Sequence, residues 1–136
     1  MEATERVVYF TRDSFCMADD VMAPNIRRFE WSDSDWAPEA SFYHMLDEYI
    51  YSGLPGYYWR GYAGKKWIAD VYLDREDDGF KKECKVAKNW RELLQKYGSV
   101  YFIHTEYENR DSLPKTLKDD GYTFKQAEKI YKEYYG

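Results

Sequence analysis

Apolar and polar residues alternate near the N-terminus in a way that predicts two β-strands joined by a long loop. The run Val7-Val8-Tyr9-Phe10 predicts a strand over residues 6–11. Residues 25–31 predict a second strand, in which Phe29 and Trp31 share one face. Pro24 ends the connection between them, because proline does not fit inside a central strand.

A helix and a hairpin follow these strands in the pattern. Pro38 suits the first turn of a helix, and the next apolar residues recur at helical spacing, which gives one buried stripe: Phe42, Met45, Leu46, Tyr49 and Ile50. Gly53 and Pro55 end that pattern. The ring-rich runs 57–62 and 66–73 flank a short connector with glycine, Ala63-Gly64-Lys65, and therefore predict a β-hairpin.

The second half of the chain predicts further strands and helices after an acidic linker at residues 74–79. Residues 80–86 alternate as a short strand does, and Asn89 is expected to cap a helix that ends at Gly98. The continuous apolar run at residues 100–103 predicts an inner strand. A helical hairpin is expected at the C-terminus, with a short helix from Ser112 to Gly121 and a second helix capped by Thr123 and Gln126.

These elements predict a single α+β domain over residues 1–136 with a mixed or antiparallel sheet. The order of elements in residues 1–78 is ββαββ, which is compatible with a β-grasp-like sheet over one helix. Residues 79–136 add a β-α-β unit and the C-terminal helical hairpin.

Composition points to a core built from aromatic rings. Tyr, Trp and Phe make up 20% of the residues, with 15 tyrosines, so some hydroxyl groups must reach the surface or find buried partners. The two cysteines, Cys16 and Cys84, have no spacing typical of a disulfide framework or a metal site. We therefore expect buried or half-buried thiols, no metal and no cofactor.

Acidic and basic residues are distributed unevenly along the chain. The formal net charge of −5 combines −8 over residues 1–80 with +3 over residues 81–136. An acidic N-terminal part favours a partner with a basic surface over a phosphate backbone. The N-terminus has no basic and apolar leader pattern, and no apolar run reaches membrane-spanning length, so we expect a cytoplasmic protein without membrane contact.

The loop after the first strand is the richest in chemistry. The stretch 11–25 holds Arg12, Asp13, Cys16, Asp19 and Asp20, and loops on a rigid scaffold often carry binding groups. Three hypotheses stay open: a binding loop or structural turn, a cation site, and a nucleophile site. The aspartate spacing matches no Ca²⁺ loop.

The nucleophile hypothesis would make the protein a thiol-dependent enzyme. Cys16 would need a base, and the chain offers only His44 and His104 as imidazoles. The neighbouring aspartates oppose it, because carboxylates raise the pKa of a thiol.

Two further segments are candidates for binding. The run containing Tyr57, Tyr58, Trp59 and Arg60 is either an aromatic platform for a partner or a hairpin with alternate rings in the core. The last predicted helix carries several lysines in a context like a helix-turn-helix, which leaves nucleic acid or a nucleotide as an alternative ligand, although acidic residues dilute the basic charge.

The loop also resembles a known pattern. Residues 11–25 are similar to the T-R-D-S-x-C-x-x-D-D-x-x-A-P-[HN] loop of small uncharacterised bacterial proteins, and Leu54-Pro55 stands where their Leu-Pro turn falls. Asn25 replaces the histidine that often follows the proline. The resemblance covers roughly residues 6–73 and implies a shared scaffold and a shared use of the loop residues, with no activity attached.

These features together favour a non-enzymatic cytosolic protein that binds another protein, as an inhibitor or an immunity-type factor of bacterial or phage origin. Its binding residues would be the following: Arg12, Asp13, Cys16, Asp19, Asp20, Tyr57, Tyr58, Trp59 and Arg60. The alternatives are a thiol enzyme using Cys16 with His44 or His104, and a nucleotide or nucleic-acid binder using Tyr and Trp stacking with the C-terminal lysines.

Overall fold

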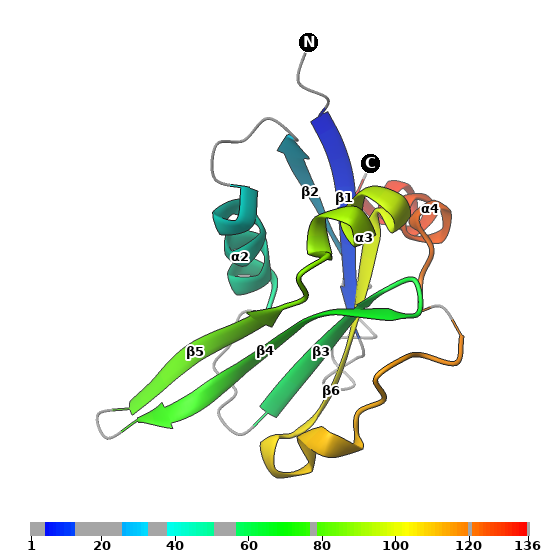
Figure 1. Cartoon of the computed structure of the whole chain (residues 1–136). Helices are drawn as coiled ribbons and strands as arrows, with labels where there is room; N and C mark the ends of the chain where they lie inside the picture. The colour runs from blue at the N-terminus through cyan, green and yellow to red at the C-terminus, as the bar shows by residue number, and fades with distance from the viewer. Residues whose placement is uncertain are drawn as a thin grey trace.

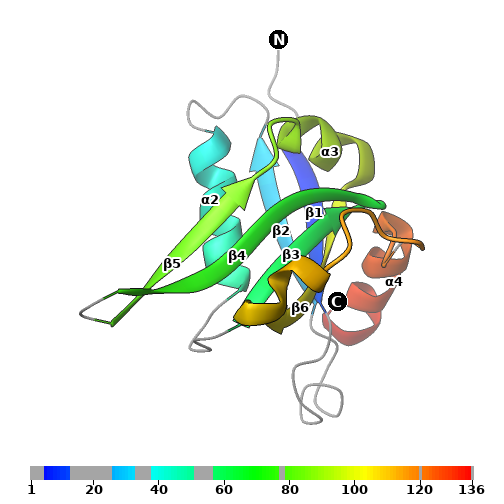
Figure 2. The same ribbon diagram turned by 60° about the horizontal axis from the view of Figure 1, so that its bottom comes forward.

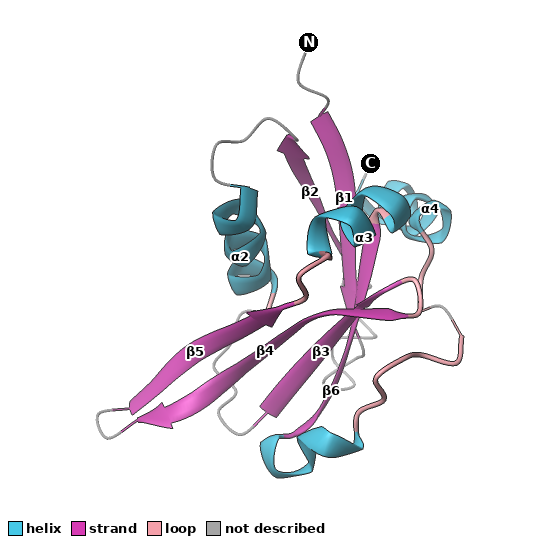
Figure 3. Cartoon of the chain, in the orientation of Figure 1, coloured by secondary structure: helices cyan, strands magenta, loops and turns pink. Residues whose placement is uncertain are grey.

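The computed structural model describes residues 5–12, 26–32, 38–50, 57–76, 79–119 and 121–135. Its elements in chain order are shown in Figures 1 and 3 and are as follows: β1 (Glu5–Arg12), β2 (Ile26–Ser32), α2 (Pro38–Tyr49), β3 (Tyr57–Ala63), β4 (Lys66–Glu76), β5 (Gly79–Val86), α3 (Trp90–Tyr97), β6 (Ser99–Glu106), η1 (Tyr107–Ser112) and α4 (Phe124–Tyr135). The predicted strands, the long helix after Pro38 and the last helix are confirmed. No helix in these ranges has the length and apolar character needed to cross a membrane.

One mixed sheet of six strands, in the order β2-β1-β6-β3-β4-β5, forms the centre of the molecule. β1 and β6 pair in parallel, and the other neighbours pair antiparallel. The β1–β2 and β3–β4 pairs are not neighbours, because β6 lies between them and supplies the parallel partner of β1. The four strands of residues 1–78 therefore do not form the predicted β-grasp-like sheet by themselves. The predicted inner strand is confirmed, since β6 lies between β1 and β3 and joins both parts of the chain in one sheet.

The sheet curls around α2, which contacts both edge strands, β2 and β5. The buried stripe of α2 is confirmed by Phe42, Met45, Leu46, Tyr49 and Ile50, each at most 9% exposed. α3 packs beside it on β3, β4 and β6. We call the side of the sheet under α2 and α3 the core face; its strand residues in the main core include Val8, Phe10, Trp59, Val71 and Phe102.

The opposite side of the sheet, which we call the open face, carries the alternate strand residues, among them Tyr9, Tyr58, Arg60 and Asp70. α4 covers only the β1 and β2 part of it, where Ala127 packs on Tyr9. The predicted capping box at the start of α4 is confirmed: Thr123 and Gln126 exchange backbone-to-side-chain hydrogen bonds of 3.0 and 3.2 Å. In Figure 2, η1 lies in front of β3 and β6, whereas α2 lies behind β5.

The β3–β4 hairpin contains a bulge that sets the register of the open face. Gly64 takes a φ of +62° in the turn, as predicted for the connector. Ala63 pairs with Lys66 and Tyr62 with Trp67, but the register shifts by one residue between Gly61 and Tyr62. As a result, Asp70 rather than Ala69 stands opposite Arg60.

Two predictions for the second half are wrong. Residues 113–119, expected as the first helix of a helical hairpin, form a non-helical segment that we call the strap. The strap bridges to the β3–β4 turn: Thr116 pairs with Lys66, and the Leu117 amide donates to the Lys65 carbonyl at 2.9 Å. These long-range bonds outweigh local helical propensity.

The other wrong prediction is the exposed linker at 74–79. β4 continues to Glu76 and β5 begins at Gly79, so this segment contributes to a hairpin, with Asp74 in register with Lys81. The α3 cap differs in detail, since Asn89 occupies the N-cap position without a side-chain capping bond. Gly98 ends α3 in the left-handed conformation, as expected.

Candidate functional site

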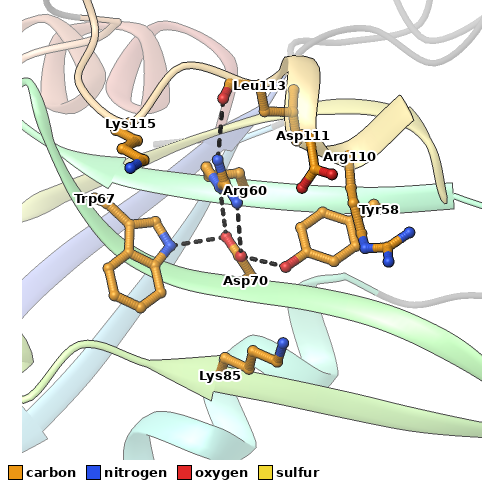
Figure 4. A pocket seen from close by; sticks show the side chains of 9 residues that line it. All are labelled: Tyr58, Arg60, Trp67, Asp70, Lys85, Arg110, Asp111, Leu113 and Lys115. Atoms are coloured by element: carbon orange, nitrogen blue, oxygen red, sulfur yellow. Dashed lines mark hydrogen bonds and ion pairs between the residues drawn. The ribbon is translucent and has the colours of Figure 1, made fainter. Parts of the chain in front are cut away.

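The open face holds a pocket of about 590 Å³ between β3, β4 and β5 on one side and η1 and the strap on the other (Figure 4). We call it the Asp70 pocket. It is lined by Tyr58, Arg60, Trp67, Asp70, Lys85, Arg110, Asp111, Leu113 and Lys115. Its volume lies in the range of pockets that hold small molecules, about 300–1,000 Å³.

Asp70 is the centre of the hydrogen-bond network. It is only 3% exposed, although it is charged, because β4 carries it on the open face beneath the other lining residues. Its carboxylate accepts hydrogen bonds from the Tyr58 hydroxyl, from two nitrogens of Arg60 and from the Trp67 indole N–H at 2.7 Å. Four donors nearly saturate a carboxylate, which makes Asp70 a fixed anchor.

Arg60 is held in place by this anchor. Its Nε and Nη2 donate to the two Asp70 oxygens at 2.9 and 3.1 Å, and its Nη1 donates to the Leu113 carbonyl of the strap at 3.1 Å. The hydrogen bond to Asp70 is the main cause that raises the pKa of Arg60, so its charge is permanent. The Tyr58 and Tyr62 side chains also interact with this guanidinium, which fixes it further.

A cluster of tyrosines forms one wall. Tyr58 stacks on Tyr72 with ring centroids 4.9 Å apart, and Tyr107 packs against both rings. Arg110 lies over the Tyr107 ring at 4.3 Å and donates to its carbonyl. Burial, helped by the bond to Asp70, raises the pKa of Tyr58, so its hydroxyl stays protonated at neutral pH and donates.

The strap is fastened over the pocket by side chains of β3. Arg60 binds the Leu113 carbonyl, and the Tyr62 hydroxyl donates to the Pro114 carbonyl. Burial raises the pKa of Tyr62 to about 12, which keeps this hydroxyl a donor. The strap thereby brings Lys115 to the rim of the pocket.

The pocket is positively charged in an acidic protein. Four cationic side chains and two carboxylates line it, which leaves a formal excess of two positive charges, whereas the whole chain carries −5. Asp70 offsets Arg60. Within the described ranges, Lys85, Arg110 and Lys115 form no salt bridge and Asp111 offsets only one charge. A low-dielectric recess lined by such cations attracts anions.

The side chains that line the pocket can bind a ligand, but they do not include a nucleophile paired with a base. None of its side chains is a serine, cysteine or histidine, and the Asp70 lone pairs are already engaged. The part of the chain that the structure describes contains no cluster of three or more metal-ligating side chains. The arrangement is therefore suited to recognition of a charged ligand.

The structure distributes the predicted binding residues over both faces of the sheet. Tyr58 and Arg60 lie in the Asp70 pocket, whereas Trp59 is 3% exposed in the main core. Arg12 lies over the Trp59 and Tyr49 rings at 5.6 and 5.7 Å. Tyr57 is half-buried, with its ring 5.7 Å from that of His104. Asp13, Cys16, Asp19 and Asp20 lie outside the described residues.

The two imidazoles of the thiol-enzyme hypothesis lie on different elements, and Cys16 is outside the described residues. The His44 side chain is 77% exposed on α2, with its Nε2 3.9 Å from a carboxylate oxygen of Glu48. His104 is half-buried on β6, its ring 4.5 Å from that of Trp59. Cys84 is half-buried and packs against the main core, as predicted for it.

Sequence reasoning missed most of the pocket: Trp67, Asp70, Lys85, Arg110, Asp111, Leu113 and Lys115. One signal was present, since Asp70 interrupts the apolar run Trp67-Ile68-Ala69-Asp70-Val71 and a carboxylate in a buried strand requires a partner. The partner, Arg60, could not be identified from the sequence, because it stands opposite Asp70 only as a result of the bulge.

No family model matches this chain, and comparison with curated proteins and with solved structures also gave no match. Function is therefore argued from the geometry of the pocket.

Proposed function

We propose that this protein is a non-enzymatic binding protein that takes a small anionic ligand into the Asp70 pocket. The observation that carries the proposal is Arg60, which is fixed by Asp70 in a pocket with an excess of positive charge. A cation that is held in position before binding loses little conformational freedom when it meets an anion.

Two further features support this proposal. The Arg60 side chain is 18% exposed, and a guanidinium suits the oxygen atoms of a phosphate or carboxylate. Lys85 and Lys115 add positive charges from β5 and from the strap (Figure 4).

Of the functions predicted from the sequence, this proposal is nearer to the nucleotide-binding alternative than to a protein partner with a basic surface. The reason is that the pocket itself is basic and would repel such a surface. It retains the cytosolic location as part of the proposal, and cell fractionation tests that part.

Titration calorimetry with inorganic pyrophosphate at low salt tests the proposal. Removal of two rim charges, in Arg110→Ala with Lys115→Ala, should weaken binding at least ten-fold, and added salt should weaken wild-type binding because the contact is electrostatic. The matched control removes two exposed lysines outside the pocket lining, Lys118→Ala with Lys129→Ala, and should bind like the wild type. Undetectable wild-type binding, or equal losses in both double variants, would contradict the proposal.

Protein binding is a second candidate, favoured by exposed tyrosines near the chain end. Tyr134 and Tyr135 on α4 are 61% and 53% exposed, and tyrosine is enriched in protein interfaces. A pull-down from bacterial lysate at physiological salt should retain a partner with the wild type and lose it with Tyr134→Ser and Tyr135→Ser. Retention of the same proteins by both, or of none by either, counts against this candidate.

A further inference from the structure

We propose that the ligand of the Asp70 pocket is a free mononucleotide, with its base stacked on Trp67 and its phosphate at Arg60 and Lys115. This inference rests on the proposed function, since it names the class of anion that the pocket takes.

Trp67 is the residue that points to a planar base. Trp59 lies against His104 and Arg12, and Trp90 stacks on Phe42 at 4.8 Å with Arg91 over its ring. The Trp67 indole, in contrast, has neither a ring nor a cation stacked on it from the described residues, although it is only half-buried and lines the pocket.

The orientation of Trp67 is fixed before any ligand arrives. Its Nε1–H donates to Asp70 at 2.7 Å, so the nitrogen edge of the ring points to the anchor (Figure 4). The same carboxylate holds Arg60, and the aromatic surface and the fixed cation are therefore tied to one residue. Proteins that bind single-stranded nucleic acids stack the bases on aromatic side chains while nearby cations contact the phosphates.

Two cations lie on the side of the pocket that holds the indole. Arg60 lies next to the Trp67 ring, and Lys115 lines the pocket from the strap on the same side (Figure 4). Arg110 lies beyond the Tyr58 ring, stacked on Tyr107, and adds positive charge at the other end of the pocket. One ligand with a ring and a phosphate satisfies both parts of the pocket.

A free nucleotide fits these observations better than a nucleic-acid strand. A strand needs a basic path that follows successive phosphates, whereas this chain has a net charge of −5 and the excess of two positive charges in the pocket lies within a recess of about 590 Å³. A recess of that size suits a single small ligand.

The experiment compares adenosine 5′-monophosphate with ribose 5-phosphate by titration calorimetry of the full chain. The two probes share the sugar and the phosphate, and only the first carries a base. The nucleotide should bind at least ten-fold tighter to the wild type, because stacking on an aromatic side chain contributes about one decade in affinity or more.

Two substitutions separate stacking from the hydrogen bond of Trp67. Trp67→Phe keeps a ring and loses the N–H, and should retain most of the ten-fold difference between the probes. Trp67→Leu loses the ring, and the two probes should then bind within about two-fold of each other, while ribose 5-phosphate binds as it does to the wild type. The wild-type comparison stands by itself if either variant fails to fold.

Other results of these titrations would contradict either the stacked base or the anion site. Equal wild-type affinity for the two probes would refute base stacking and leave anion binding intact, provided that pyrophosphate binds. Failure of all three probes would refute the proposed function itself. A ten-fold preference for a ten-nucleotide single strand over the mononucleotide would assign the pocket to nucleic acid, and the same preference for O-phosphotyrosine would assign it to a modified peptide.

Discussion

The two faces of the sheet use the same residue types for different purposes. On the core face, aromatic rings are packed against each other, and the Arg12 guanidinium covers the rings of Tyr49 and Trp59. On the open face, Arg60 and Trp67 are instead held by one buried carboxylate at the edge of a recess. The difference lies in exposure. The rings of the core face are buried, whereas Trp67 is half-buried and the Arg60 side chain is 18% exposed at the pocket, as the proposed recognition requires.

The largest effect is expected on the core face. Phe102 is fully buried on β6 between the Phe10 and Tyr49 rings. Phe102→Ala should lower the free energy of unfolding by about 4 kcal/mol, because it removes buried area and leaves a cavity. Urea denaturation measures this. Tyr134→Ala, at a position that is 61% exposed, should change it by less than about 0.5 kcal/mol. Similar losses in both variants would refute the contrast between core and surface.

The next largest effect tests the part of the open face that should matter most for stability. Asp70→Asn leaves the Arg60 charge without its partner in a part-buried site, and should cost about 3 kcal/mol of unfolding free energy. Asp111→Asn, an exposed carboxylate in the same pocket, is the matched control and should cost less than about 0.5 kcal/mol. A loss below 1 kcal/mol for the Asp70 variant would show that it does not anchor the network.

A smaller effect is expected where the strap is fastened. Tyr62→Phe removes the hydrogen bond to the Pro114 carbonyl and should cost about 1 kcal/mol at neutral pH. Because burial raises the pKa of Tyr62 to about 12 from its ordinary value of 10, the unfolded chain loses this proton first as pH rises. The stabilising contribution is therefore complete below pH 10 and is lost by about pH 12.

Denaturation at several pH values checks this pH dependence. The buried hydroxyls of Tyr49 and Tyr58 also have raised pKa values and add to the wild-type decline in alkali. Tyr62→Phe should decline less steeply than the wild type between pH 10 and 12. Parallel curves for the two proteins would contradict the role given to Tyr62.

The smallest effect on stability is expected at the rim of the pocket. Lys115→Ala removes an exposed side chain that forms no salt bridge within the described residues and should change the free energy of unfolding by less than about 0.5 kcal/mol. Arg110→Ala also loses the contact with the Tyr107 ring and should cost about 0.5–1 kcal/mol. The same variants should weaken pyrophosphate binding. A loss of stability above 1 kcal/mol would mean that the rim is structural, and the comparison between the faces would no longer hold.

Local patterns predicted the elements well, because helical spacing and alternation are properties of short segments. The stripe of α2 and the turn at Gly64 are examples. Residues 113–119 were misjudged as helical, because their structure depends on Lys65 and Lys66, about fifty positions earlier in the chain. Their backbone partners cannot be seen in a local window.

The site was harder to predict because it depends on register and on distant segments. A simple hairpin places Ala69 opposite Arg60, and only the bulge brings Asp70 there. Arg110 and Lys115 reach the same pocket only because β6 and the strap pass beside β3. The sequence signals that were visible, a charged loop and a ring-rich run, led instead to residues on both faces of the sheet.

The most direct test of the central claim, that the open face holds a preformed anion site, is an NMR titration of side-chain N–H resonances with inorganic pyrophosphate. The account predicts that the Arg60 Nε–H and Trp67 Nε1–H signals shift together and saturably, while the indole signals of Trp59 and Trp90 on the core face stay in place. Unchanged Arg60 and Trp67 signals at saturating pyrophosphate, or equal shifts of all three indoles, would contradict it.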